Sequence, residues 1–320
     1  MGNPAAAREC WFCGQDCRVL WEGLSDDRFG APGTYDILRC SGCGLEQTWP
    51  RPTEAELKDL YERFYNAGVE PGGTYQFLRE RFLASGWYRL WLHWDGDLTF
   101  HLRRGRGRLL DLGCNEGRGL SLYAANGFTA EGLEINEKAA ALARQRGFTV
   151  FTGALADFTP AEPYEVVVLS NVLEHAPDPV AMLTEVRRLL KPGGEVWISC
   201  PNADSLWRGI FGRAWINWHV PFHLWHFSAQ TLRAVLERAG FRPASRQSFT
   251  PALWLAQSMC VRPGAGAGKV NRLMRSAPVV AGLMLAARLL VLPFFSRADR
   301  RLRGDCLLTT ASLEQEPCGC

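Results

Sequence analysis

The stretch Arg108-Leu-Leu-Asp-Leu-Gly-Cys-Asn-Glu-Gly-Arg-Gly119 decides the fold of this chain of 320 residues. It begins as a short apolar run over 109–112, breaks into small and turn-forming residues over 113–119, and continues as a helical pattern. This order predicts a buried strand, a tight turn and the start of a helix. Such a turn presents backbone N–H groups at a helix N-terminus and lets a ligand approach closely.

A second strand-like run, Thr129 to Ile135, follows after one helix and carries Glu134 near its end. An acidic residue about 20 positions after a Gly-rich turn is the usual hydrogen-bond partner of a nucleotide ribose. Together, the turn and Glu134 predict a nucleotide-containing cofactor.

Three motifs in the same order carry a resemblance to a known family. Asp111–Gly117 resembles the first motif, D/E-x-G-x-G-x-G, of class I S-adenosylmethionine (SAM) dependent methyltransferases, with Asn115 in place of the middle glycine. The block from Tyr164 to Pro179 resembles that family's fourth strand and loop, and the block from Leu190 to Ser199 resembles its turn into the fifth strand. The resemblance covers about residues 105–250 and implies a Rossmann-like α/β sheet of seven strands, the last antiparallel, with SAM as cofactor.

The chain alternates strand and helix from Arg108 onward, as a parallel sheet requires. Strands are expected near 108–112, 129–134, 148–151, 164–170, 194–200, 242–249 and 305–312. Helices are expected near 117–126, 136–146 and 178–190, with another that begins after Ser228.

The cysteines are grouped rather than spread along the chain. The pairs Cys10/Cys13 and Cys40/Cys43 have the spacing of a structural zinc site with four thiolate ligands. Cys17 is a spare thiol that can substitute for one ligand. We expect a zinc ribbon over 1–50, with a role in structure or substrate contact, and a cytoplasmic, reducing location.

Two further segments complete the organisation. Residues 51–104 are expected to form a helical linker or cap, in which Thr53 is the N-cap of the first helix. A stripe of Trp residues (87, 91, 94) on a later helix fits either packing over the sheet or an aromatic substrate-binding site. Residues 105–320 form the methyltransferase domain, interrupted by an apolar, basic-flanked insertion at 251–303. Within it, 278–295 holds Arg288, which argues against a membrane span. An interfacial helix on the inner face of the cytoplasmic membrane and a hairpin packed on the domain or a partner both fit.

Composition and one loop restrict the substrate. The formal net charge of +3 argues against a dedicated nucleic-acid binder. The loop Ser170–Leu173 lacks the Asn/Asp-Pro-Pro-Tyr/Phe clamp of enzymes that methylate exocyclic base amines. A small-molecule acceptor is therefore expected.

The resemblance also implies roles for individual residues. The turn would hold the methionine part of SAM, Glu134 the ribose and Asp157 the adenine amine, while Asn171 lies in the loop after the fourth strand. The residues assigned to the cofactor are Asp111, Gly113, Asn115, Gly117, Glu134, Asp157 and Asn171.

Histidines are the candidates for proton removal from the acceptor. His175 follows the fourth strand, and a second group lies between the fifth strand and its helix, from which His223 and His226 are candidates. A metal site made from these histidines and Glu174 is an alternative, as in quinone-type methyltransferases with a similar Leu-Glu-His loop.

The segment Pro221–Ser228 resembles one common in sugar- and polysaccharide-associated methyltransferases, and a zinc ribbon precedes the domain in similar sugar C-methyltransferases. We therefore expect O- or C-methylation of a nucleotide- or lipid-linked sugar in cell-surface glycan synthesis. Methylation of a quinone or other membrane lipid is the first alternative. A catalytically silent protein that docks a partner through the ribbon is the second.

Overall fold

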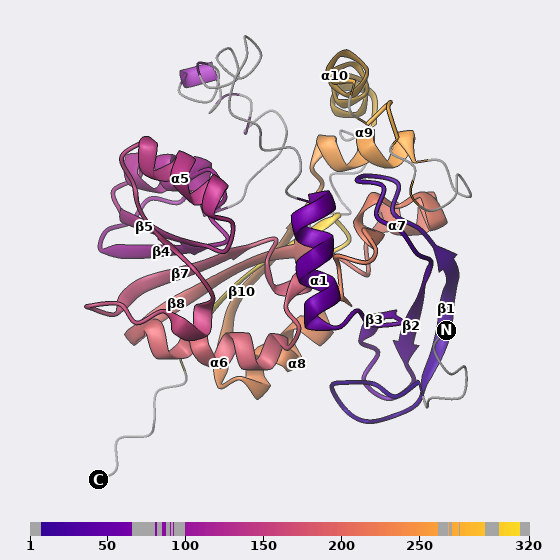
Figure 1. Ribbon diagram of the computed structural model, residues 1–320, viewed down its shortest axis with the longest axis horizontal. Coiled ribbons are helices and arrows are strands. Elements are labelled where there is room, and N and C mark those ends of the chain that lie inside the picture. Colours follow the sequence, from indigo (N-terminus) through magenta and orange to yellow (C-terminus); the bar gives the residue numbers. More distant parts are fainter. Residues whose placement is uncertain are drawn as a thin grey trace.

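Two β-sheets form the framework of the protein. The computed structural model describes residues 8–65, 100–261, 276–291 and 301–313, together with 81, 85–87, 90, 92, 268 and 271–274. Among these residues a seven-stranded sheet lies next to a smaller, N-terminal sheet of four strands (Figure 1).

The large sheet has the strand order β10-β11-β8-β7-β4-β5-β6. Strands β4 to β8 pair in parallel, and β11 lies antiparallel between β8 and β10. The Rossmann-like sheet with an antiparallel last strand is thus confirmed. Its strands are β4 (Arg108–Leu112), β5 (Thr129–Glu134), β6 (Thr149–Thr152), β7 (Tyr164–Ser170), β8 (Leu190–Pro201), β10 (Phe241–Phe249) and β11 (Cys306–Leu313).

Strand β8 begins four residues earlier than the sequence indicates. Leu190 already pairs with Tyr164, and the register then shifts so that Glu195 pairs with Val166. The Lys-Pro-Gly-Gly segment is therefore an irregularity inside the strand rather than a turn before it. Gly193 has a φ of 75°, which lets the extra residues loop out.

Both faces of the sheet are buried, as parallel sheets require. Leu109 and Leu110 point to opposite faces and are each fully buried, in two different apolar clusters. One face is covered by α6 (Pro179–Leu189) and α8 (Ala229–Arg238) (Figure 1). The other face contacts α4 (Arg118–Ala125) through Tyr123. A further helix, α5 (Glu137–Gln145), packs beside β6.

Side-chain caps begin the two helices α6 and α8. Asp178 accepts a hydrogen bond from the N–H of Ala181 at 2.7 Å, with Pro179 at the first helical position. Ser228 accepts from the N–H of Thr231 at 3.1 Å. These local signals set where α6 and α8 begin.

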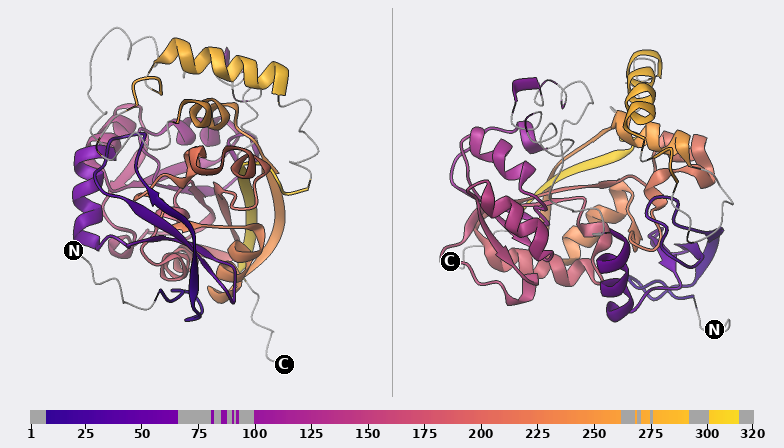
Figure 2. Two further views of the ribbon diagram at one scale, coloured as in Figure 1. Left: turned by 90° about the vertical axis from the view of Figure 1, so that its right-hand side faces the viewer. Right: turned by 45° about the horizontal axis from the view of Figure 1, so that its top comes forward.

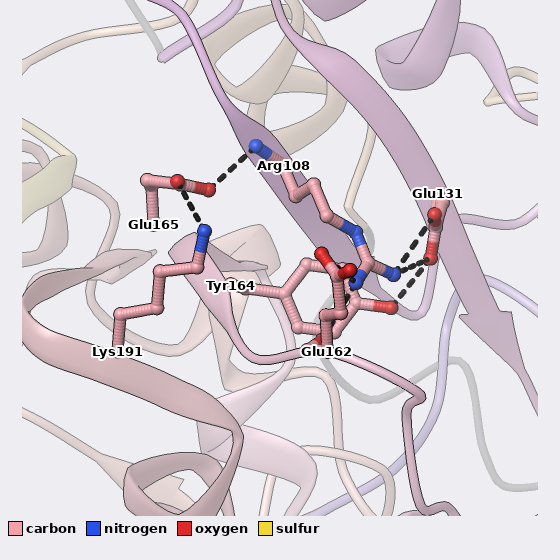
Figure 3. Close-up of polar contacts among 6 residues, drawn as sticks. All are labelled: Arg108, Glu131, Glu162, Tyr164, Glu165 and Lys191. Atoms are coloured by element: carbon pink, nitrogen blue, oxygen red, sulfur yellow. Dashed lines mark hydrogen bonds and ion pairs between the residues drawn. The ribbon is translucent and has the colours of Figure 1, made fainter.

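A polar network joins β4, β5, β7 and β8 near the start of β4 (Figure 3). Arg108 donates to both carboxylate oxygens of Glu131 at 3.0 and 3.1 Å, and Tyr164 donates to Glu131 at 2.6 Å. Glu165 accepts from the backbone N–H of Arg108 and from Lys191, both at 2.6 Å. Since the network lies at the amino end of β4, it supports the sheet from the edge opposite the expected cofactor site.

The N-terminal sheet is joined to the large domain. It consists of β1 (Cys17–Leu24), β2 (Tyr35–Cys40) and β3 (Glu46–Trp49). Its fourth strand is β9 (Trp225–His226), which comes from the part of the chain that forms the large sheet. Trp225 packs against Trp11 with ring centroids 5.0 Å apart. Arg208 forms an ion pair with the buried Glu46 at 3.0 Å. The N-terminal segment therefore rests on the domain through strand pairing, an aromatic contact and a buried ion pair.

The cap begins as the sequence predicts and continues differently. Thr53 and Glu56 form the capping box of α1 (Glu54–Leu60), which continues as one π-helical turn, Tyr61–Tyr65. The expected second helix with the Trp stripe lies almost wholly outside the described residues. A short helical turn, Phe100–Leu102, precedes β4.

The insertion contains two short helices, α9 (Ala252–Cys260) and α10 (Ala277–Ala286), and α10 crosses over α9 at the outer edge (Figure 2). Met284 and Ala287 pack with Leu255, whereas Val279 and Leu285 are exposed. The described part thus shows one apolar face packed on the domain and another exposed. No helix among the described residues is long and apolar enough to cross a bilayer.

Candidate functional site

The turn between β4 and α4 forms the first part of the site. Gly113, Asn115 and Gly117 have positive φ values of 69°, 50° and 77°. A Cβ at Gly117 would lie 2.9 Å from the Cβ of Ala143, so a side chain does not fit there. Asn115 adopts the left-handed conformation that Asn tolerates better than most residues. The turn therefore has the geometry that the sequence motif predicts.

Glu134 lies at the carboxyl end of β5 and faces this turn. Its Oε2 accepts a hydrogen bond from the N–H of Asn115, and its Oε1 accepts one from the N–H of Asn136, both at 2.8 Å. Each carboxylate oxygen has a further lone pair. The side chain is thus held in place by the backbone and can still accept two ribose hydroxyls.

Asp111 adds a second carboxyl group. Burial, and next the charge of Glu134, raise the pKa of Asp111 to about 8. SAM carries a positive sulfonium and a positive ammonium group, which would offset the mutual repulsion of these two carboxylates. The donor set at the ends of β4 and β5 therefore fits SAM.

The two other cofactor candidates lie near the same edge of the sheet. Asp157 is exposed in the short helical turn Leu155–Asp157 after β6, and Asn171 is exposed after β7 with a φ of 55°. The sequence-predicted cofactor residues are thus spread along the carboxyl ends of β4, β5, β6 and β7, where ligands bind in open α/β sheets.

Three histidines lie together beside this edge. The ring of His223 is 4.7 Å from that of His175 and 4.7 Å from that of His219. The rings of His175 and His219 also contact aromatic side chains described below. Burial lowers the pKa values of all three histidines, that of His175 to about 4. At neutral pH these imidazoles are therefore uncharged.

Hydrogen bonds determine which ring nitrogens are basic. The Nδ1 of His223 lies 2.8 Å from the carbonyl oxygen of Asn217, so it carries the proton and leaves Nε2 as an acceptor. His219 then donates from its Nδ1 to that Nε2 at 3.3 Å, which leaves its own Nε2 unprotonated and without a partner among the described residues. The Nδ1 of His175 lies 2.7 Å from the hydroxyl of Tyr61.

The third predicted histidine has a different location. His226 is in β9, with its Nε2 3.2 Å from the hydroxyl of Thr48 and its ring against Trp218. It therefore lies in the joint between the N-terminal sheet and the domain. His219, which the sequence reasoning did not select, takes part in the cluster instead; its spacing of four residues before His223 was the available signal.

Glu174 is the most unusual group in the site. It is 1% exposed, and neither carboxylate oxygen has a hydrogen-bond partner in the described part of the chain. Burial raises its pKa to about 8. Ligand atoms of Glu174, His175 and His223 lie within 4.8 Å of one another. A proton or a divalent cation held by these three residues would satisfy this carboxylate.

Aromatic side chains enclose the histidines. Tyr65 lies 5.2 Å from Phe222 and 5.8 Å from His219, and Tyr61 lies 5.4 Å from Phe222, all between ring centroids. Burial raises the pKa of Tyr65; the charge of Arg28 lowers it, and the carboxylates of Glu174 and Glu134 raise it. We call these side chains the aromatic–histidine cluster: Tyr61, Tyr65, His175, His219, Phe222 and His223.

The four cysteines of the N-terminal segment come together. The Sγ atoms of Cys10 and Cys43 are 3.6 Å apart, and those of Cys13 and Cys40 are 3.3 Å apart. Tetrahedral zinc with Zn–S bonds of about 2.3 Å requires sulfur atoms about 3.8 Å apart, so the set fits zinc. Cys17 lies in β1 and is not part of the four.

The chain is similar to several known proteins. Residues 69–245 match the sequence model of a family described as methyltransferase domain. A ubiquinone biosynthesis O-methyltransferase from Cereibacter sphaeroides is 33% identical over 175 residues, which are 50% of this chain and 71% of that relative. Another from Methylococcus capsulatus is 36% identical over 104 residues, 30% of this chain and 44% of that relative. A SAM-dependent methyltransferase structure from Archaeoglobus fulgidus has a TM-score of 0.44 and 21% identity, and covers 75% of this chain and all of its own.

Proposed function

Because this chain belongs to the methyltransferase-domain family and is a SAM-dependent methyltransferase, we propose that it methylates a hydroxyl oxygen of a quinone-type aromatic or related membrane lipid. The relatives named above, which act in ubiquinone biosynthesis by their names, support this acceptor class. The observation that carries the proposal is the aromatic–histidine cluster, which pairs flat apolar side chains with basic nitrogens beside the cofactor edge.

SAM, when bound, supplies a methyl group that is displaced in line from its sulfonium. The protein must hold the acceptor hydroxyl and take its proton. We assign this role to His175, whose Nδ1 lies 2.7 Å from the hydroxyl of Tyr61. Burial lowers the pKa of His175 to about 4, so the imidazole is neutral at pH 7.

The cofactor assignments follow the arrangement along the strand ends. The turn after β4 would cradle the methionine part, Glu134 would bind the ribose and Asp157 the adenine amine. The proposed set is Asp111, Gly113, Asn115, Gly117, Glu134, Asp157 and Asn171. Cys10, Cys13, Cys40 and Cys43 are proposed to hold a structural zinc.

A divalent cation is an alternative way to activate the acceptor. Glu174, His175 and His223 provide one carboxylate and two imidazoles at short range. A cation there would lower the pKa of a bound hydroxyl and neutralise Glu174. His175 would then be a ligand rather than the base.

A membrane-derived acceptor also agrees with the insertion. The exposed side chains of α10 are apolar, and the sequence from 262 to 303 contains nine Lys or Arg residues against one Asp. We propose that this face contacts an anionic membrane surface. Loss of binding to anionic vesicles on deletion of 276–291, with cofactor affinity retained, would support this; unchanged binding would refute it.

The glycan acceptor expected from the sequence becomes the second candidate. Its supporting observation is the position of the zinc-bearing segment, which rests on the domain as a substrate-contacting module would. The names of the relatives favour the quinone-type acceptor over it.

The deciding experiment offers the purified protein methyl-labelled SAM with either a catechol or a sugar nucleotide such as UDP-glucose. Label in the catechol, reduced by His175→Ala while S-adenosylhomocysteine binding persists, supports the proposal. Label only in the sugar nucleotide supports the second candidate and contradicts the first.

A further inference from the structure

A loop of the N-terminal module reaches the aromatic–histidine cluster. This loop follows β1, and the carboxylate of Asp26 holds it rigid. Asp26 accepts hydrogen bonds from the backbone N–H groups of Arg28 at 2.8 Å, Phe29 at 3.1 Å and Ala31 at 2.8 Å. Asp26 is 3% exposed, so the loop conformation is fixed from inside.

The loop inserts Phe29 among the rings of the cluster. Phe29 lies 5.0 Å from Tyr65, 5.4 Å from His219 and 5.8 Å from Phe222, measured between ring centroids. The N-terminal module thus forms one wall of the site that we assign to the acceptor.

This insertion places Arg28 in a cleft next to the histidines. The cleft is lined on one side by loop residues that include Asp26, Asp27 and Arg28, and on the other by Trp215, Ile216, Trp218 and His219. Burial is the main reason that the pKa of His219 lies well below its usual value, and the guanidinium of Arg28 lowers it further. Arg28 therefore contributes positive charge close to the basic nitrogens.

Arg28 forms no ion pair within 4.0 Å in the described part of the chain; burial raises the pKa of Asp26, and the charge of Arg28 partly offsets this. No carboxylate there lies within 4.0 Å of its guanidinium, which instead lies 5.1 Å above the ring of Phe29. Two acids directly precede Arg28: Asp26 already accepts backbone hydrogen bonds at both oxygens, and Asp27 forms no ion pair with Arg28 within 4.0 Å. A half-buried guanidinium with five donors and no acceptor is a suitable binding group for an oxyanion.

We propose that Arg28 binds a carboxylate or phosphate group on the methyl acceptor, so that the zinc-bearing module selects anionic acceptors. This inference rests on the proposed function for the location of the acceptor. It also gives the module a role in the site itself, because the loop that carries Arg28 belongs to it.

The first test measures binding of matched probes to the protein saturated with S-adenosylhomocysteine. The probes are benzoate, phenyl phosphate and the neutral benzamide. The wild-type protein is expected to bind one anion at least about tenfold more tightly than benzamide. Arg28→Gln should remove this preference, Arg28→Lys should retain part of it, and Arg18→Gln, at an exposed position of β1, should leave it unchanged.

The binding results distinguish a carboxylate from a phosphate on the acceptor, and they can also refute the proposal. Tighter benzoate indicates a carboxylate acceptor, and tighter phenyl phosphate indicates a phosphorylated one. No anion preference in the wild-type protein, or the same preference in Arg28→Gln, overturns the proposal. Only the backbone N–H of Arg28 bonds to Asp26, so Arg28→Gln is expected to keep the loop.

The second test distinguishes this inference from the proposed function. It compares methylation of 3,4-dihydroxybenzoate and 3,4-dihydroxybenzamide. If neither compound is methylated but the anion preference in binding depends on Arg28, the proposed acceptor class is wrong and the anion site is supported. If both compounds are methylated with equal KM values in the wild-type protein and in Arg28→Gln, the acceptor class is supported and the anion site is wrong.

Discussion

Glu174→Gln should change how the stability of the protein depends on pH. The carboxylate of Glu174 is buried, and neither of its oxygens has a partner among the described residues. Burial raises its pKa from 4.5 to about 8. The folded state therefore binds a proton that the unfolded state releases between these two pH values.

The difference between the folded-state and unfolded-state pKa of Glu174 determines the sign and size of this pH dependence. A raised folded-state pKa contributes stability that is fully present below the unfolded pKa and is lost as pH rises toward the folded pKa. Each pH unit in this window corresponds to about 1.4 kcal/mol. Between pH 5 and pH 7.5 the wild-type protein should thus lose roughly 3 kcal/mol relative to Glu174→Gln, which cannot ionise there.

Urea unfolding in metal-free buffers at several pH values measures this difference. The control is Glu237→Gln, since exposed Glu237 is paired with Arg233 at 2.6 Å on the surface of α8. Its curve should run parallel to that of the wild type. Parallel curves for Glu174→Gln and the wild type would refute the reasoning about an unpaired buried carboxylate. Added Mn²⁺ should raise the wild-type unfolding midpoint at pH 7.5 and leave that of Glu174→Gln unchanged if the cluster binds a cation.

Glu134→Gln is expected to weaken S-adenosylhomocysteine binding by on the order of tenfold to a hundredfold, because its amide replaces an acceptor oxygen with a donor; calorimetric titration would measure this, with Glu137→Gln as the control, and equal affinity would contradict the ribose assignment. Purified protein should carry about one zinc per chain, and Cys13→Ser should lower both the zinc content and the thermal midpoint; full zinc in the variant would contradict the ligand set. Tyr61→Phe should reduce kcat by roughly tenfold with unchanged cofactor affinity, because the buried Nδ1 of His175 loses its 2.7 Å partner; an unchanged kcat and pH profile would argue against His175 as the base.

Local signals made much of the fold predictable. The run from Arg108 to Gly119 contains a complete strand, a turn with glycines at positive φ and a helix start within twelve residues. Asp178 and Ser228 mark helix starts through bonds to N–H groups three residues away. Such features depend on near neighbours in the chain, so the sequence displays them directly.

Residues whose role depends on distant partners were harder to identify. The sequence gives no reason to prefer His226 or His219 as a member of the cluster. Only His219 contacts His175 and His223, because β9 pairs with β3 and directs His226 toward Thr48. The direction of a side chain in such a strand is decided by its partner strand, here about 180 residues away in the chain.

The sequence by itself predicted the large sheet, the Gly-rich turn after β4, Glu134 at the end of β5 and the four paired cysteines. Each of these features depends on the spacing of residues that are close together in the chain. Only the tertiary structure decided that Tyr61, His219 and Glu174 share one enclosed cluster and that Arg28 from the N-terminal module lies beside it. The physical reason is that the cluster and the Arg28 loop come from four separate segments of the chain, 28–29, 61–65, 174–175 and 219–223, and their contacts arise when the sheets pack, not from any pattern within one segment.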